Sequence, residues 1–268
     1  MPVYTASFSK QFPGTIWKII ADAEKGLLYI ETRDGQSRKA FFHAIDLTAK
    51  KILWSDLSIL DPWWSSLKFA TTGKLLIVKF NDPEMPEQRG MAVINGLTGK
   101  ILWGKEDAQV IHPDVDGIVV SNGNEEGIYL KINWEDGNLI REMSLKDLVD
   151  KRNKNGNELA QVAYPFHFEE ENSFFSKIQE YITVITGQKA VRMIEYLEKG
   201  DKVLISYYIY EEGKLSNYML VADENGNKLL HENMRGELNG IGMDTFFVLK
   251  DQLIIIKNTN ELQAYVVK

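Results

Sequence analysis

The chain has 268 residues, of which 44% are hydrophobic and 26% are charged, as in an ordinary globular protein. Its 31 basic and 38 acidic side chains give a formal net charge of −7, which argues against a nucleic-acid binder because phosphate backbones attract positive surfaces. The absence of cysteine excludes structural disulfides, thiol catalysis and thiolate metal sites.

The first segment of the chain, Met1–Phe12, carries a single lysine and no apolar run of signal-peptide length. No later segment reaches the roughly 18 consecutive apolar residues that a membrane helix needs. These observations predict a cytoplasmic protein that does not bind membranes.

An internal repeat is the clearest pattern in the sequence, since residues 44–54 align without gaps on residues 93–103. Weaker copies occur at 132–140 and 221–230. In every copy an Asp or Asn is followed, six and seven residues later, by two apolar residues. These turn residues are Asp46, Asn95, Asn133 and Asp223. Because Asp, Asn and Gly favour turns, each copy predicts two strands joined by a tight turn.

Further strand-like runs precede the first three copies of the repeat. They are Trp17–Ala21 and Leu27–Glu31, Leu67–Ala70 and Leu75–Phe80, and Val110–Ile111 and Ile118–Ser121. Four short strands in every ~40–50 residues is the spacing of a propeller blade. Since a four-stranded sheet cannot bury both of its faces alone, the pattern predicts an all-β protein whose sheets stack around an axis.

The two strong copies end in Lys51-Ile52-Leu53-Trp54 and Thr98-Gly99-Lys100-Ile101-Leu102-Trp103. They resemble the tryptophan-docking repeat of quinoprotein-type β-propellers, a WD40- or PQQ-like repeat in which the tryptophan packs between neighbouring blades. The first copy departs from that pattern, because Ala49-Lys50 stands where Thr-Gly is usual. Over its whole length the chain is also similar to an uncharacterised bacterial family of short propeller-like proteins, which implies no activity.

Quinone-dependent oxidation is the activity that this resemblance would suggest. The dehydrogenases of that family are far longer and pair cysteines beside the cofactor, whereas this chain has none. We therefore expect no cofactor.

The number of blades follows from where the second strand of each unit begins. These starts lie near Leu27, Leu75, Gly117, Lys202 and Gln252. The long interval between the starts at Gly117 and Lys202 leaves room for a sixth blade, but we favour five blades with an insertion at 145–188. Within it, Phe174, Phe175, Ile178, Tyr181, Ile182 and Ile185 form an apolar stripe at helical spacing. The stripe predicts one amphipathic helix over about 173–186, capped by Asn172 or Ser173 and stopped by Gly187.

The last unit, from Asp244 to Val267, is one strand short of a complete blade. The segment Val3–Phe8 is strand-like, and its pairing with Glu261–Val267 would supply that strand and close the ring. We therefore expect residues 1–268 to form a single β-propeller domain.

Motifs of common enzyme classes are missing, since the sequence has no nucleophile elbow, phosphate loop or His-Glu-x-x-His zinc motif. Its histidines are too far apart for a local metal motif, so no metal site is predicted. A propeller axis nevertheless gathers residues from different blades, and acid–base chemistry there would use imidazole and carboxylate groups. The candidate catalytic residues are His112, His167, Asp61 and Asp244.

Two aromatic pairs are candidate ligand-binding residues. Trp63 and Trp64 follow Asp61-Pro62 on an expected loop, where they would stack on a sugar, base or peptide, or cover the core between blades. Tyr207 and Tyr208 lie on opposite faces of an expected strand, so the alternation predicts that only one of them is in the core.

The favoured function is a non-catalytic propeller scaffold that binds an unidentified protein or small-molecule ligand, because the recognisable motifs are architectural. The alternative is a hydrolase or lyase that acts on a small molecule or glycan in the central funnel. The sequence leaves open whether the protein is an enzyme.

Overall fold

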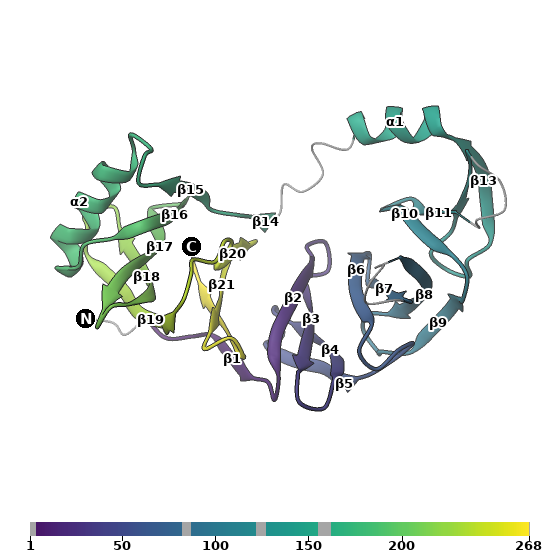
Figure 1. Cartoon of the computed structure of the whole chain (residues 1–268), viewed down its shortest axis with the longest axis horizontal. Helices are drawn as coiled ribbons and strands as arrows, with labels where there is room; N and C mark the ends of the chain where they lie inside the picture. Colours follow the sequence, from purple (N-terminus) through teal and green to yellow (C-terminus); the bar gives the residue numbers. More distant parts are fainter. Residues whose placement is uncertain (1–3, 82–86, 122–126, 155–161, 268) are drawn as a thin grey trace. The chain divides into compact units, whose positions relative to one another are not determined.

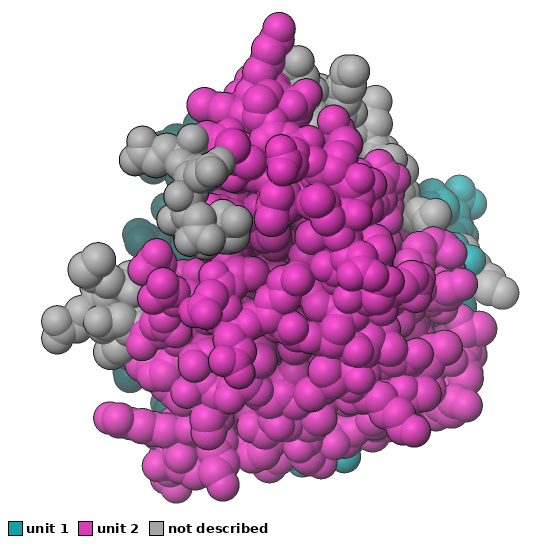
Figure 2. All heavy atoms as spheres, turned by 90° about the vertical axis from the view of Figure 1, so that its right-hand side faces the viewer, with its two compact units in different colours: residues 1–11, 162–268 teal, residues 12–161 magenta. Residues whose placement is uncertain are grey.

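The computed structural model describes residues 4–81, 87–121, 127–154 and 162–267. These residues form 22 strands and two helices, and the strands make five sheets of four or five strands each (Figure 1). The chain divides into two compact units, residues 12–161 and residues 1–11 with 162–268 (Figure 2). No helix among the described residues is long and apolar enough to cross a membrane.

The unit of residues 12–161 contains three four-stranded sheets, in each of which every strand pairs antiparallel with the next one in the chain. The first sheet is β2 (Thr15–Asp22), β3 (Leu27–Asp34), β4 (Lys39–Asp46) and β5 (Lys51–Leu57). The second is β6 (Ser65–Thr71), β7 (Lys74–Phe80), β8 (Gln88–Asn95) and β9 (Ile101–Lys105). The third is β10 (Gln109–Asp114), β11 (Gly117–Ser121), β12 (Ile128–Ile132) and β13 (Leu139–Ser144), and helix α1 (Leu145–Lys154) follows it.

The other unit contains two five-stranded sheets. The fourth sheet has the order β15 (Phe166–Glu169), β16 (Val191–Lys199), β17 (Lys202–Glu211), β18 (Lys214–Asp223) and β19 (Lys228–Leu238). The fifth has the order β14 (Val162–Ala163), β20 (Phe246–Leu249), β21 (Gln252–Lys257), β22 (Glu261–Val266) and β1 (Phe8–Gln11). Helix α2 (Phe175–Thr186) connects β15 to β16.

Sheets that follow one another in a unit stack face to face. In β7, Leu75 and Ile77 pack with the first sheet, while Leu76 and Val78, on the opposite face, pack with the third. The middle strands are therefore buried on both faces, which explains why they are continuous apolar runs rather than alternating ones. In the second unit the fourth sheet packs one face on the fifth sheet and the other on α2.

The two repeat tryptophans occupy equivalent places in consecutive sheets. The indole Nε1 of Trp54 donates to the carbonyl of Gly96 at 2.8 Å, and that of Trp103 donates to the carbonyl of Trp134 at 3.0 Å. Each ring lies against a turn glycine with positive φ: a Cβ atom on Gly99 would lie 3.1 Å from the Trp54 ring, and one on Gly137 would lie 2.8 Å from the Trp103 ring. The tryptophans thus dock on the turn of the following sheet.

The acidic or amide residue of each repeat shapes its turn. The Oδ1 atoms of Asp46, Asn95, Asn133 and Asp223 all accept hydrogen bonds from backbone N–H groups two to four residues later. Such bonds replace the backbone pairing that the turn lacks. The strand–turn–strand prediction is confirmed for all four copies.

The region between β13 and β16 differs in detail from the predicted insertion. Its described residues form no sixth sheet, but they add helix α1 and two short edge strands, β14 on the fifth sheet and β15 on the fourth. Helix α1 has a recognisable start, because Ser144 and Asp147 exchange backbone-to-side-chain hydrogen bonds. The sequence interpretation missed this signal.

Helix α2 covers Phe175–Thr186, within the predicted range, and Gly187 in the left-handed conformation ends it. Its start differs from the prediction. The residue at the N-cap is Phe174, which makes no side-chain capping bond, and Asn172 instead accepts the N–H of Phe174 at 2.9 Å. Asn172 therefore fixes the turn that precedes the helix and does not cap it.

The N-terminal strand completes the fifth sheet, as the sequence predicts, but at a different position. Strand β1 is Phe8–Gln11, antiparallel to β22 with Phe8 opposite Ala264 and Gln11 opposite Glu261. In Figure 1 this purple strand lies beside the yellow C-terminal strands. Val3 lies outside the described residues. The shift arises because β1 is a polar edge strand, so its hydrophobic pattern is weak.

Candidate functional site

Three polar side chains that are far apart in the sequence converge in the unit that holds residues 162–268. His167 lies on β15, Glu195 lies on the neighbouring β16, and Asp244 lies in the loop before β20. The His167 Nε2 atom is 3.4 Å from a Glu195 carboxylate oxygen and 3.1 Å from an Asp244 carboxylate oxygen. One ligand-type atom from each residue lies within 4.8 Å of the other two. We call this group the His–Glu–Asp cluster.

Glu195 is the buried member of the cluster, with a fully inaccessible side chain. Burial raises the pKa of its carboxyl group above the ordinary value, and this effect outweighs the lowering by hydrogen bonds from Thr245 and by the nearby His167. The backbone N–H of Thr245 lies 3.1 Å from Glu195 Oε2, and the Thr245 hydroxyl also donates to that oxygen. Glu195 is thus held in one orientation, with Oε1 on the side of His167.

The other two members of the cluster are partly open to solvent. The side chain of His167 is 30% exposed and that of Asp244 is 49% exposed. The buried Nε2 atom of His167 forms no geometrically acceptable hydrogen bond with any described residue, although both carboxylates are close to it. A buried nitrogen that faces two carboxylate oxygens is suited to binding a cation or to exchanging a proton.

Of the four candidate catalytic residues, the structure brings two together. His167 and Asp244 meet in the His–Glu–Asp cluster, whereas His112 and Asp61 belong to the other unit. His112 lies half-buried on β10. Asp61 has a local role, because its Oδ1 accepts the backbone N–H groups of the two tryptophans that follow it.

The candidate aromatic residues lie in two different environments. Trp63 and Trp64 are half-buried, and the Arg33 guanidinium lies 5.0 Å from the centre of the Trp63 ring. Tyr207 and Tyr208 are both in the core, so the prediction that only one of them is buried was wrong. The reason is that both faces of β17 are covered.

The tyrosine hydroxyls also bond inside the protein. That of Tyr207 donates to Gln188 at 2.5 Å, and that of Tyr208 accepts the N–H of Gly242 at 2.8 Å. These two side chains present no surface to a ligand.

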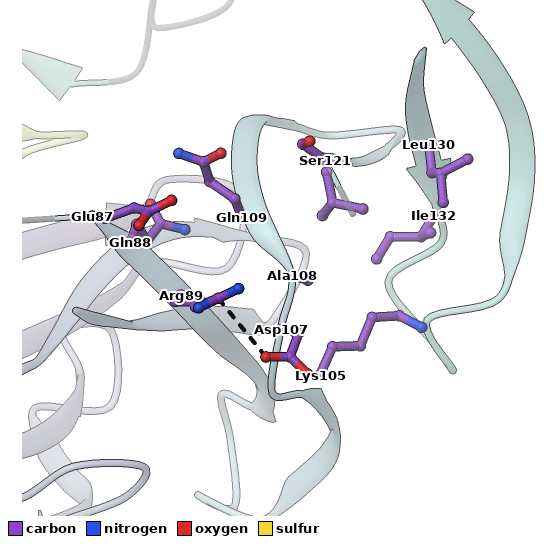
Figure 3. Close-up of a pocket in the computed structure, with 11 residues that line it drawn as sticks. Glu87, Gln88, Arg89, Lys105, Asp107, Ala108, Gln109, Ser121, Leu130 and Ile132 are labelled. Carbon is purple, nitrogen blue, oxygen red and sulfur yellow. Dashed lines mark ion pairs between the residues drawn. The ribbon is translucent and has the colours of Figure 1, made fainter. Parts of the chain in front are cut away.

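A cavity of about 580 Å³ opens between the second and third sheets (Figure 3). Glu87, Gln88 and Arg89 line one side of it, and Leu130 and Ile132 line the opposite side. Its remaining lining residues are Lys105, Asp107, Ala108, Gln109, Val120 and Ser121. The cavity therefore combines an apolar wall from β11 and β12 with charged groups of both signs from β8 and the β9–β10 connection.

Gln88 is the most unusual residue of this cavity. Its side chain is 8% exposed, and its amide Nε2 is buried without a hydrogen-bond partner among the described residues. Buried polar atoms are nearly always paired, so an unpaired amide at a cavity wall has a donor available for a ligand. The nearby Arg89 and Asp107 approach to 3.8 Å but are both largely exposed, so their pair is weak.

Sequence reasoning missed Glu195 and the whole cavity. The sequence does mark Glu195 as unusual, since it is the one charged residue inside the apolar run Met193–Leu197 of β16. No sequence pattern marks the cavity, because its walls come from strands that only the packing of two sheets brings together.

Comparison with known proteins adds a family model and structural similarities. A model described as a domain of unknown function, DUF4905, matches residues 21–103. No curated protein matches the chain. Among solved structures, it is similar to the β-propeller domain of the Trilobed protease from Pyrococcus furiosus, with 12% identity over 94% of this chain and 81% of that one, at a TM-score of 0.33.

Two further similarities are to the Dos1 propeller and to the uncharacterized protein lmo1340 from Listeria monocytogenes EGD-e. The first has 10% identity, covers 96% of this chain and 63% of that one, and has a TM-score of 0.34. The second has 9% identity, covers 96% of this chain and 82% of that one, and has a TM-score of 0.33. The chain spans 52% of a similar eukaryotic initiation factor and 28% of Chaetomium thermophilum Raptor. At TM-scores this low, the description of the fold rests on the five sheets themselves.

Proposed function

We propose that the protein is a non-catalytic binding protein that holds a small amphipathic molecule in the cavity between its second and third sheets. The observation that carries the proposal is the buried amide of Gln88, which has no hydrogen-bond partner among the described residues and lies on the wall of a 580 Å³ cavity. Pockets for small ligands typically measure about 300–1,000 Å³ and combine apolar walls with a few placed polar groups.

The lining indicates the chemistry of the ligand. Val120, Leu130 and Ile132 offer an apolar wall for an aliphatic or aromatic body. Arg89 and Lys105 lie near the acidic Glu87 and Asp107, so a ligand with both an anionic and a cationic group would find partners for each. Free amino acids and dipeptides have this character.

The binding test compares wild type with Gln88→Met by saturation-transfer NMR, with free amino acids and dipeptides as probes. We expect at least one probe to bind the wild type and Gln88→Met to weaken it about tenfold, the value of one hydrogen bond. Gln88→Met should also raise the free energy of unfolding by about 1 kcal/mol, since methionine has the same shape without a buried unpaired donor. Chemical denaturation measures this gain.

Gln36→Met is the matched control, because Gln36 is exposed in the turn between β3 and β4. It should change neither binding nor stability. A wild type that binds none of the probes, or a Gln88→Met variant that binds them as tightly, would contradict the proposal.

We propose further that the five sheets are five blades of a single quinoprotein-type propeller, closed by the N-terminal strand. The equivalent docking of Trp54 and Trp103 and the face-to-face stacking of sheets within each unit support this arrangement. So does the pairing of β1 with β22, because it covers an edge of the last sheet with a strand from the other end of the chain.

A hydrolase or lyase is the second candidate function, favoured by the convergence of His167 and Asp244 beside Glu195. An imidazole between two carboxylates can donate and accept protons in bond cleavage. Turnover of ester or glycoside substrates by wild type, abolished in His167→Gln, would favour this candidate over the binding protein.

A further inference from the structure

We infer that His167, Glu195 and Asp244 form a binding site for one divalent transition-metal ion of the Zn²⁺ type. The inference is independent of the proposed ligand cavity, because the cluster lies on the fourth sheet and the loop before the fifth. One imidazole nitrogen and two carboxylate oxygens are a donor set that suits Zn²⁺, with further positions left for water.

Two of the three distances between donor atoms are near those of ligands that share a metal ion, and the third, between the Glu195 and Asp244 oxygens, is at most 4.8 Å. Zinc binds nitrogen and carboxylate oxygen at about 2.0–2.2 Å, which places neighbouring ligand atoms of a tetrahedral site roughly 3.3–3.6 Å apart. The Nε2 atom of His167 is 3.4 Å from Glu195 and 3.1 Å from Asp244. Little movement of the side chains is therefore needed for an ion to bind.

A simple ion pair accounts less well for this geometry. A hydrogen-bonded pair would direct the Nε2–H of His167 at one carboxylate, yet Nε2 forms no acceptable hydrogen bond with either of them. A cation shared by the three residues would bind the Nε2 atom and both carboxylates at once.

The surroundings of Glu195 have the character of a second coordination shell. The side chains form a chain of hydrogen bonds in which Asn217 donates to Ser206, Ser206 contacts Thr245 at 2.6 Å, and Thr245 donates to Glu195 Oε2. Since the Thr245 hydroxyl hydrogen points to Glu195, the Ser206 hydroxyl donates to Thr245. The chain fixes Oε2 and leaves Oε1 facing His167, which is how outer-shell partners orient metal ligands.

Exposure of the other two ligands provides access for the ion. The half-exposed Asp244 and the partly exposed His167 border solvent, whereas Glu195 is fully buried. A buried carboxylate is costly even when it accepts hydrogen bonds, as Glu195 does from Thr245, and a bound cation would lower that cost.

Isothermal titration calorimetry of the chelator-treated full-length protein with Zn²⁺ tests the inference. We expect one ion per chain, a Tm that rises with Zn²⁺ concentration, and at least tenfold weaker binding in Asp244→Asn. Asp244 is in an exposed loop, so this variant should fold, and circular dichroism checks that it does. Glu195→Gln should weaken binding at least as much.

Asp251→Asn is the matched control, because Asp251 is an exposed aspartate of the same unit whose carboxylate pairs with Lys199. It should bind Zn²⁺ as wild type does, and Mg²⁺ should bind wild type much more weakly, since magnesium avoids imidazole ligands. The inference is overturned if wild type shows no stoichiometric binding, if the two asparagine variants bind alike, or if Mg²⁺ binds as tightly as Zn²⁺.

Discussion

Replacing Gly96 by alanine is expected to destabilise the unit of residues 12–161 by about 3 kcal/mol. Gly96 is buried at the start of a turn, and its carbonyl accepts the indole hydrogen bond of Trp54. A Cβ atom at this position would overlap the hydroxyl oxygen of Tyr29 and lie 2.9 Å from the carbonyl oxygen of Gly73. Because one of these neighbours is backbone, the turn itself has to move, and the docking of Trp54 moves with it.

Gly35→Ala isolates this steric effect. Gly35 also lies in a turn and also lacks a positive φ, but a Cβ atom there would have no neighbour within 4 Å. Its replacement should change the free energy of unfolding by less than about 0.5 kcal/mol. Urea denaturation of the two variants measures the difference, and equal stabilities would show that the docking turn does not have the described packing.

Removing the guanidinium of Arg33 should have a comparable cost. The Glu31 side chain is fully buried, and Arg33 pairs with it at 2.7 Å. Arg33 also donates to the backbone carbonyls of Trp63 and Ser65. In Arg33→Met the carboxylate of Glu31 would stay buried without its cation, which costs about 3–5 kcal/mol. Thermal and urea unfolding at pH 7 would measure the loss.

A surface pair supplies the control for Arg33. Arg89 and Asp107 are 3.8 Å apart and largely exposed, so Arg89→Met should cost less than about 1 kcal/mol. The double variant Glu31→Gln with Arg33→Met should recover part of the stability, because it removes the uncompensated charge. An equal loss of stability in Arg33→Met and Arg89→Met would contradict the description of Glu31 and Arg33 as a buried ion pair.

The sequence predicted the features that leave a repeated or continuous pattern along the chain. The turn at Asp46 repeats at Asn95, and local side-chain chemistry sets both turns. The docking of Trp54 and Trp103 joins consecutive sheets and follows from the repeat of the whole motif. The five second-strand positions were predicted equally well, since their apolar runs reflect burial on both faces. The polar edge strand β1 was misplaced because edge strands carry little hydrophobic signal.

The candidate sites depend on tertiary packing and were predicted only in part. The residue types of His167 and Asp244 make them candidates, but their convergence on Glu195 requires the pairing of β15 with β16 and the path of the loop before β20. The cavity at Gln88 is lined by strands of two different sheets, an arrangement that no local pattern encodes. The burial of both Tyr207 and Tyr208 likewise follows from cover on the two faces of β17.

The proposed closure of the ring depends on the pairing of β1 with β22, and a disulfide tests this pairing most directly. Ser9 lies opposite Gln263, and both side chains bond to the same Glu261 oxygen, so they share a face. The protein has no cysteine of its own. Mild oxidation of the double variant Ser9→Cys and Gln263→Cys should form an intramolecular disulfide, whereas Lys10→Cys with Gln263→Cys, on opposite faces, should stay reduced. Free thiols in both variants after oxidation would contradict the closure of the last sheet by the N-terminal strand.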